Sequence, residues 1–161
     1  MKISTNFDSG NIKVIDATDP LNIQLEINND HNSEFYQWFH FRLETTPYQL
    51  HKLNINQLEK SAYPDGWEGY QAVASYDRQT WFRVPSNYEN GTLSFEIEPE
   101  CGSVYFAYFA PYSYDRHLDL LSWAQTQGAC QLQTLGETLD GRDMSVLKIG
   151  EPSEDKKVIW V

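Results

Sequence analysis

The sequence contains a His-x-x-Glu pattern, a spacing with which two side chains can hold a divalent metal ion. His31 and Glu34 form this pattern. A catalytic zinc site would need a third protein ligand and an open position for water. His31 lies within the Asn-rich stretch 28–33, which is typical of a polar turn, and no third His stands at a recognisable position. We therefore interpret residues 31–34 as a solvated turn and assign no metal ligand.

The other three histidines favour structural roles. His40 lies in an aromatic run and is predicted to be a hydrogen-bonded core or interface residue, and His51 receives the same interpretation. His117 follows Arg116 in the first turn of a predicted helix, where it either helps to dock two domains or faces solvent. The chain has no G-x-S-x-G motif, no P-loop and no Cys-His arrangement, so no catalytic or cofactor-binding residue is assigned.

Two further sets of residues have a binding and a structural interpretation. Asp140 and Arg142 flank a glycine, which favours a structural role in a strand connection over acid chemistry or anion binding. Trp67, Tyr70 and Trp81 either form a platform on which a sugar or peptide stacks or fill the core and a domain interface. Packing in the core is the favoured interpretation.

Charge and composition exclude several classes of function. The 161 residues include 12 basic and 23 acidic side chains, giving a formal charge of −11, which argues against nucleic-acid and anionic-lipid partners. Cys101 and Cys130 form no Cys-x-x-Cys pair and are expected to be free thiols in a reducing compartment. The N-terminus lacks the apolar core of a signal peptide and no stretch is long enough to span a bilayer, so we expect a cytoplasmic protein.

Residues 1–110 have the pattern of an antiparallel β-sandwich. Short apolar or alternating segments are separated by turns such as Asp77-Arg78 and Asn90-Gly91. Asn90-Gly91-Thr92 also matches a glycosylation acceptor, but without an export signal the hairpin turn is favoured. The predicted strands are 12–15, 21–27, 35–43, 49–55, 72–76, 80–84, 92–97 and 104–110.

Residues 111–161 have a different pattern. Pro111 ends the last strand, Ser113 can cap a helix, and Gly128 is a plausible stop for that helix. Strands 131–135 and 144–149 follow, joined by the Asp140-Gly141 turn, and an apolar strand is predicted at 157–161. Since an apolar strand needs cover on both faces, we expect these residues to belong to the front part of a longer polypeptide.

Several segments resemble the zinc metallocarboxypeptidases. Residues 135–150, with Asp140-Gly141-Arg142 before a Val-Leu-Lys-Ile strand, are similar to the opening of that catalytic domain. Residues 105–117 look like the domain boundary of the cytosolic carboxypeptidase subfamily. Further stretches similar to the N-terminal β-sandwich of that subfamily are 38–42, 63–70, 75–78 and 81–85.

The resemblance implies a β-sandwich over 1–110 followed, over 111–161, by the first helix and strands of an α/β zinc carboxypeptidase domain. In the family, two His and one Glu hold Zn²⁺, a second Glu is the general base, and an Arg grips the terminal carboxylate of the peptide or protein substrate. The subfamily trims C-terminal or branched glutamates.

The family's zinc ligands, its carboxylate-binding Arg and its general base correspond to positions beyond Val161. These 161 residues are therefore expected to be an inactive scaffold that limits substrate access and has its own catalytic domain as partner. The alternative is a stand-alone acidic binding module that uses Trp67, Tyr70 and Trp81 to bind a glycan or an extended peptide.

Overall fold

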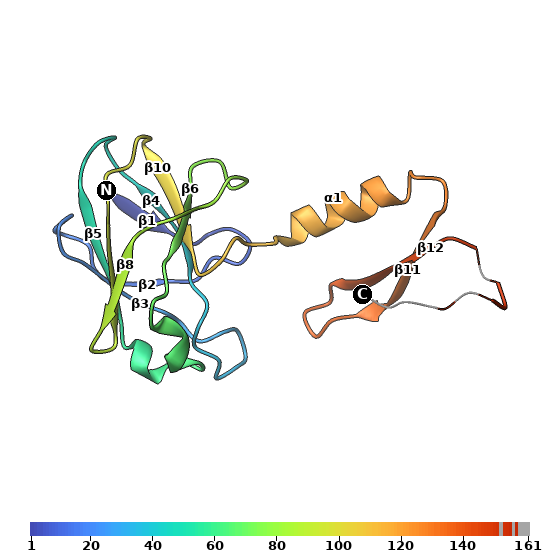
Figure 1. Cartoon of the computed structure of the whole chain (residues 1–161), viewed down its shortest axis with the longest axis horizontal. Coiled ribbons are helices and arrows are strands. Elements are labelled where there is room, and N and C mark those ends of the chain that lie inside the picture. The colour runs from blue at the N-terminus through green and yellow to red at the C-terminus, as the bar shows by residue number, and fades with distance from the viewer. Residues whose placement is uncertain (152, 156, 158–161) are drawn as a thin grey trace. The chain divides into compact units, whose positions relative to one another are not determined.

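The computed structural model describes residues 1–151, 153–155 and 157, and the chain divides into two compact units (Figure 1). The first unit is Met1–Pro111 and the second is Tyr112–Val161. Strands dominate the first unit, whereas the second contains one α-helix and a β-hairpin among its described residues.

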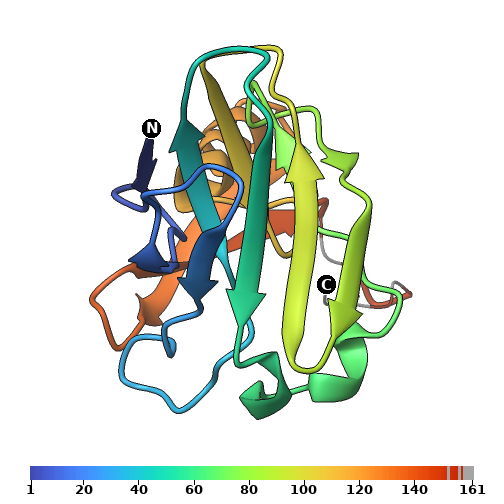
Figure 2. The ribbon, with the colours of Figure 1, turned by 90° about the vertical axis from the view of Figure 1, so that its left-hand side faces the viewer.

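Two five-stranded sheets form the first unit. Sheet A has the order β1 (Lys2–Ser4), β4 (His40–Glu44), β10 (Ser103–Ala107), β6 (Val73–Ser75), β7 (Phe82–Arg83). Sheet B has the order β2 (Lys13–Asp16), β3 (Ile23–Glu26), β5 (His51–Asn56), β9 (Thr92–Ile97), β8 (Ser86–Glu89). Figure 2 shows β5, β9 and β8 side by side. The structure therefore confirms a mainly β fold with antiparallel sheets.

One neighbouring pair among the described strands departs from the antiparallel prediction. β3 and β5 run parallel, with Ile23 opposite Leu53 and Leu25 opposite Ile55. The chain leaves sheet B after β3, contributes β4 to sheet A and then returns as β5. Because the crossing to and from sheet A reverses the chain direction twice, β3 and β5 point the same way.

The core lies between the two sheets and is built by alternate residues of their strands. From sheet B, Leu53 and Phe95 point inward, and from sheet A, Phe41 and Phe106 do so; each is at most 2% exposed. The rings of Phe95 and Phe106 meet across the sheets with their centroids 5.3 Å apart. Burying one such side chain contributes about 1.5–3 kcal/mol. These four rings and side chains therefore lie at the centre of the core between the sheets.

Some predicted strands are shorter than expected because their backbone groups find other partners. Residues 35–39 form no strand, since Tyr36 O accepts from Ala62 and Phe39 O accepts from Tyr108, which belong to different segments. The predicted strand 80–84 shrinks to β7 because the carboxylate of Asp77 accepts from the amides of residues 79 and 80. The strands β1 and β8 were not predicted.

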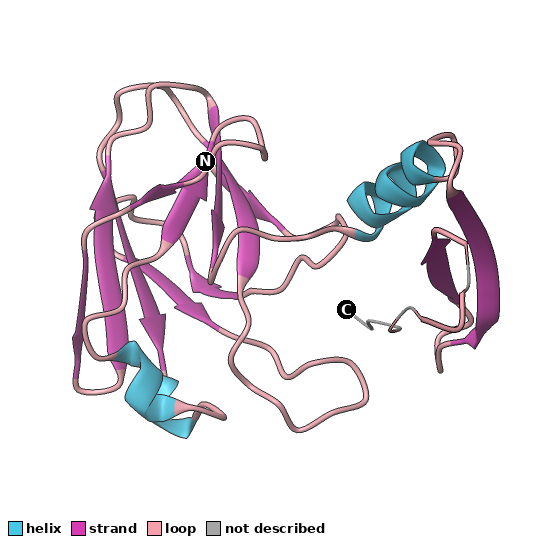
Figure 3. Ribbon diagram, turned by 45° about the vertical axis from the view of Figure 1, so that its right-hand side comes forward, coloured by secondary structure: helices cyan, strands magenta, loops and turns pink. Residues whose placement is uncertain are grey.

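A segment with two short 3₁₀ helices follows β5 (Figure 3). These helices are η1 (Leu58–Lys60) and η2 (Pro64–Trp67). Trp67 is 0% exposed and its Nε1 donates to the Oγ of Ser61 at 2.8 Å. The Trp67 ring also stacks on Phe39 with centroids 6.4 Å apart. Trp67 thus attaches this segment to the core.

The N-terminal segment covers the outer face of sheet A at His40. The ring of Phe7 lies 4.8 Å from that of His40, and the Oγ of Ser9 is hydrogen-bonded to its Nδ1 at 3.0 Å. His40 is 1% exposed. Burial lowers the pKa of His40 from 6.5 to about 4, and the positive charge of Arg78 acts in the same direction while Asp8 opposes it. The prediction of a hydrogen-bonded core histidine is confirmed.

The second unit begins with a capped helix. In α1 (Tyr114–Ala124), the Oγ of Ser113 accepts from the amide of Arg116 at 3.2 Å, as the sequence predicts. The helix ends before Gly128, which has a φ of +69°. The strands β11 (Cys130–Glu137) and β12 (Asp143–Ile149) pair antiparallel. In the described residues no helix is long and apolar enough to cross a membrane.

The predicted strand 157–161 falls largely outside the described residues, because positions 158–161 are not among them. The hairpin and helix before it carry a large exposed apolar surface. Among the described hydrophobic residues of this unit, only Leu121 and Ala124 are buried. Large apolar side chains that are exposed are Leu118, Leu120, Trp123, Leu132, Leu135, Leu139, Met144 and Ile149.

Replacing Trp67 with alanine is expected to destabilise the first unit by about 3–5 kcal/mol, because it removes a fully buried ring and leaves the Ser61 hydroxyl unpaired. Urea unfolding followed by circular dichroism measures this change. The matched control is Trp123→Ala, since Trp123 is 62% exposed and its loss should change the free energy of unfolding by less than about 0.5 kcal/mol. Equal effects of the two changes would contradict the packing described for Trp67.

His40 is expected to make the first unit less stable in mild acid. Folding lowers the pKa of His40 from 6.5 to about 4, so between these values the unfolded chain binds more protons. The contribution of neutral His40 is complete above about pH 6.5 and is lost as the pH falls toward 4, amounting to roughly 1–3 kcal/mol.

The free energy of unfolding, measured from pH 7 to pH 4 for the wild type, His40→Gln and the exposed control His31→Gln, tests this expectation. The His40 variant should lose less stability across that range than the other two proteins. Three parallel pH profiles would show that His40 does not carry the effect.

Candidate functional site

The His31–Glu34 pattern lies in an exposed turn. The amide of Ser33 donates to Asp30 O at 3.1 Å, and Asp30 in turn donates to Phe35 O at 2.8 Å. His31 and Glu34 are both exposed. The prediction of a solvated turn is confirmed. Throughout the described part of the chain, no three His, Cys, Asp or Glu side chains lie close enough to hold a metal ion.

The two remaining histidines occupy different environments. His51 is 0% exposed, with its Nε2 hydrogen-bonded to the Oγ1 of Thr45 at 2.7 Å, and burial lowers its pKa. This confirms its structural interpretation. His117 is half-buried in α1, with its ring 6.4 Å from that of Tyr112. Whether His117 helps to dock two domains stays a prediction.

The aromatic platform proposed as an alternative is not present as an exposed surface. Trp67 is fully buried, and the half-buried ring of Tyr70 is stacked on Tyr108 with centroids 4.9 Å apart. Trp81 is half-buried beside His40, with ring centroids 5.9 Å apart. A glycan could not stack on Trp67, so this part of the alternative is wrong. The aromatic residues pack inside the first unit instead.

Asp140 and Arg142 lie in the connection between β11 and β12. Gly141 has a φ of +73°, which glycine adopts without strain. The amide of Thr138 donates to Arg142 O at 2.8 Å, and the guanidinium of Arg142 lies over the ring of Tyr114 at 4.5 Å. These contacts agree with the structural role predicted for the turn, and they attach the hairpin to the start of α1.

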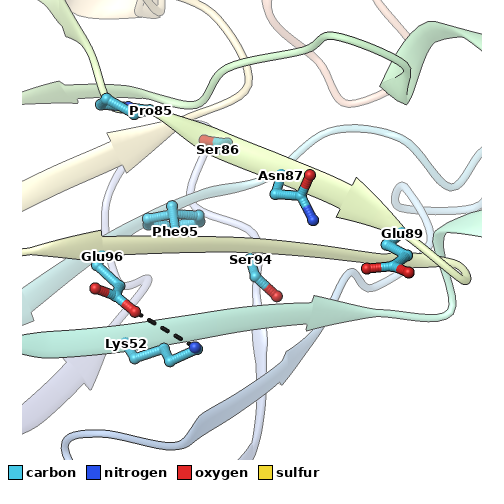
Figure 4. A pocket seen from close by; sticks show the side chains of 8 residues that line it. All are labelled: Lys52, Pro85, Ser86, Asn87, Glu89, Ser94, Phe95 and Glu96. Carbon is cyan, nitrogen blue, oxygen red and sulfur yellow. Dashed lines mark ion pairs between the residues drawn. The ribbon is translucent and has the colours of Figure 1, made fainter.

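A hollow of about 630 Å³ opens on the outer face of sheet B (Figure 4). It is lined by residues of β5, β8 and β9, including Lys52, Ser94 and Glu96. The Nζ of Lys52 pairs with a carboxylate oxygen of Glu96 at 3.3 Å, and the Oγ of Ser94 donates to Asn54 at 2.8 Å. Because these polar groups satisfy one another, the hollow offers little for the recognition of a charged ligand.

A cluster of aromatic and basic side chains on the outer face of sheet A offers more groups that could contact a ligand than the hollow on sheet B does. The cluster, called here the arginine–aromatic cluster, consists of Phe7, His40, Arg42, Arg78, Trp81 and Tyr105. Strands β4 and β10 position its centre, since Arg42 and Tyr105 are partners in their register. A hydrogen bond to Tyr105 and the nearby Glu44 raise the pKa of Arg42.

Arg78 is held at the rim of this cluster by a tight turn. Its amide donates to the Oγ of Ser75 at 2.8 Å, and its φ is +62°. Asp77 accepts hydrogen bonds from the amides of Thr80 and Gln79, which lower the pKa of its carboxyl to about 2. The guanidinium of Arg78 lies over the rings of Phe7 and Tyr105, at 5.8 and 5.5 Å from their centroids.

Sequence reasoning missed the arginine–aromatic cluster. Its members come from four separate segments, around positions 7, 40, 80 and 105, so no short sequence motif contains them together. The outward positions of Arg42 and Tyr105 on their strands were an available signal, but only the pairing of β4 with β10 brings the two side chains together.

Known proteins resemble this chain over nearly its full length. An uncharacterized protein of Zymomonas mobilis is 39% identical over 161 residues, which are 100% of this chain and 41% of that protein. A putative carboxypeptidase A from Shewanella denitrificans has a solved structure with 52% identity and a TM-score of 0.93, covering 98% of this chain and 42% of that one.

A second solved structure is a metallo-carboxypeptidase from Pseudomonas aeruginosa in complex with (2-guanidinoethylmercapto)succinic acid. It is 45% identical with a TM-score of 0.88, and the match covers 96% of this chain and 41% of that one. This chain therefore spans about two fifths of the length of these relatives.

A family model covers most of the first unit. The model of the cytosolic carboxypeptidase N-terminal domain matches residues 3–109, which include all ten strands of sheets A and B except for Lys2 of β1. A match over more than half of the chain, together with the high structural similarity to metallo-carboxypeptidases, identifies the family. The chain belongs to the cytosolic carboxypeptidase N-terminal domain family.

Proposed function

We propose that this chain is the N-terminal part of a zinc-dependent metallocarboxypeptidase that removes C-terminal residues, glutamate among them, from peptides or proteins. The observation that carries the proposal is the 52% identity and TM-score of 0.93 to a putative carboxypeptidase A over 98% of the chain. That coverage extends beyond residue 109, where the family model ends, so the similarity includes the second unit.

In this proposal, residues 1–110 form a scaffold that restricts which substrates reach the active site. Residues 111–161 supply the first helix and strands of the α/β catalytic domain. The exposed apolar side chains of α1, β11 and β12 support this division. A two-stranded hairpin with unpaired edges and apolar groups on its surface is marginal by itself, and further strands and helices of a catalytic domain would cover it.

In this proposal, the zinc ion is held by residues of the full-length enzyme outside these 161, and the described residues include no group of three His, Cys, Asp or Glu placed to hold a metal ion. Zinc polarises a scissile carbonyl and activates water in enzymes of this kind. The compound in complex with the Pseudomonas aeruginosa relative is a succinic acid derivative, which supports a substrate carrying carboxyl groups. The family's cytosolic members support a cytoplasmic location for this protein.

The full product of the gene is expected to release C-terminal residues, and the 161-residue chain alone is expected to release none. Mass spectrometry of peptides ending in glutamate, lysine or phenylalanine measures the release and its preference. Removal of the metal with 1,10-phenanthroline should abolish release, and added Zn²⁺ should restore it.

The 161-residue chain is the control in the same assay. The proposal would be wrong if the longer protein bound zinc and released nothing, if chelation left its activity unchanged, or if the gene encoded nothing beyond residue 161. Release of residues other than glutamate would contradict only the proposed preference.

A further inference from the structure

We propose that residues 1–10, called here the N-terminal strap, form a latch that is closed on the outer face of sheet A at neutral pH and opens when His40 is protonated. This switch goes beyond the proposed carboxypeptidase function and does not rest on it. Every group that it requires lies in the first unit. Opening uncovers the rings of the arginine–aromatic cluster on sheet A, while the two sheets of the sandwich stay in place.

The strap can leave the sandwich because it supplies none of the buried core. Within the strap, all of which the structure describes, Ile3 packs against the core but is only partly buried. The strand β1 pairs only with β4, over three residues at the edge of sheet A, and β4 keeps β10 as its other partner. Opening of such an edge segment costs less free energy than unfolding of the whole unit.

Contacts around His40 hold the strap against sheet A. The ring of Phe7 lies 4.8 Å from that of His40 and 5.5 Å from that of Tyr105. The Oγ of Ser9 is hydrogen-bonded to the Nδ1 of His40 at 3.0 Å, and the Nε1 of Trp38 donates to Ser9 O at 2.7 Å. Ser9 has a φ of +62°, a conformation that residues other than glycine adopt at a cost. Opening of the strap therefore relieves backbone strain.

The closed strap accommodates the neutral ring of His40 but not its protonated form. His40 is 1% exposed, and its buried Nε2 has no hydrogen-bond partner among the residues that the structure describes. Protonation makes both ring nitrogens donors. Ser9 can accept from Nδ1, which leaves the Nε2–H buried without an acceptor beside the unfavourable burial of the charge itself.

The charged groups around the imidazole come from three elements. Arg78, in the turn after β6, repels the protonated ring, whereas Asp8 of the strap attracts it. Arg42 lies two positions along β4 and is paired with Glu44. From β10, Tyr105 contributes a phenol, with its ring centroid 6.3 Å from that of the imidazole. The opposing charges of Arg78 and Asp8 leave burial as the main effect on the protonated ring.

The direction of the switch follows from linkage between opening and proton binding. In the closed state burial, and then Arg78, lower the pKa of His40 from 6.5 to about 4. With the strap open the ring meets water, and its pKa lies closer to 6.5. Between these values the open state binds more protons, so each pH unit favours opening by up to about tenfold as the pH falls. The closed state is fully favoured above about pH 6.5.

Hydrogen exchange of the 161-residue chain, measured by mass spectrometry at pH 7.0 and pH 4.5, tests the latch. Exchange is expressed as a protection factor relative to an unstructured chain at the same pH. Protection of the strap should fall by between tenfold and roughly a hundredfold over this range, and at pH 4.5 the strap should be at least about tenfold less protected than β9. In His40→Gln, which cannot be protonated there, strap protection should change by less than about threefold.

Gly10→Ala tests the latch without a change of pH. A Cβ at Gly10 would lie 2.1 Å from Thr5 O, so the closed strap has no room for it. This variant should expose the strap to exchange at pH 7.0 while β9 stays protected, and the pKa of His40, followed by NMR, should rise by about one unit or more toward 6.5. The matched control is Gly102→Ala, whose Cβ would meet nothing closer than Thr45 O at 3.5 Å and should leave both quantities unchanged.

Several results would overturn the proposal. One is a strap whose protection at pH 4.5 equals that of β9, because the strap would then leave only when the whole unit unfolds. Others are equal pH dependence of the wild type and His40→Gln, or an unchanged His40 pKa in a Gly10→Ala protein whose strap is open. Because these measurements involve neither zinc nor peptide cleavage, failure of the latch leaves the proposed carboxypeptidase function untouched.

Discussion

The antiparallel pairing of β4 with β10 is the constraint on which the first unit depends. In this register Phe41 lies opposite Phe106, with ring centroids 5.2 Å apart in the core, and Arg42 lies opposite Tyr105 on the outer face. A slip of one residue would exchange the two faces, exposing phenylalanine and burying arginine. The same five residue pairs therefore determine both the packing between the sheets and the arginine–aromatic cluster.

The local pattern predicted most of the sandwich but not how its strands connect. The alternation in β3 and β9, the Asn90-Gly91 hairpin turn and the Ser113 helix cap each depend on neighbouring residues, and the structure confirms all three. The parallel pairing of β3 and β5 arises because β4 belongs to the other sheet. No local sequence pattern predicts the sheet to which β4 belongs. Residues 35–39 have strand composition, but Tyr36 O and Phe39 O accept hydrogen bonds from Ala62 and Tyr108, which belong to different segments.

The candidate site was less predictable than the fold. The sequence correctly separated His40 from His31, because the neighbours of His40 are aromatic and those of His31 are polar, and the structure buries His40 and His51 but exposes His31. The arginine–aromatic cluster brings together side chains nearly one hundred positions apart and appears only once the sheet is assembled. The resemblance in residues 135–150 carried the functional prediction, since a metal site cannot be derived from residues that do not contain its ligands.

The two units differ in how completely they bury apolar surface, and this difference supports the proposal that the chain is part of a larger enzyme. The first unit has a closed core, whereas α1 and the β11–β12 hairpin expose most of their large apolar side chains. The most direct measurement is the intact mass and zinc content of the protein isolated from its own cells. The proposed carboxypeptidase function predicts a mass well above 18.7 kDa with about one zinc per molecule. A mass of 18.7 kDa without zinc would contradict it.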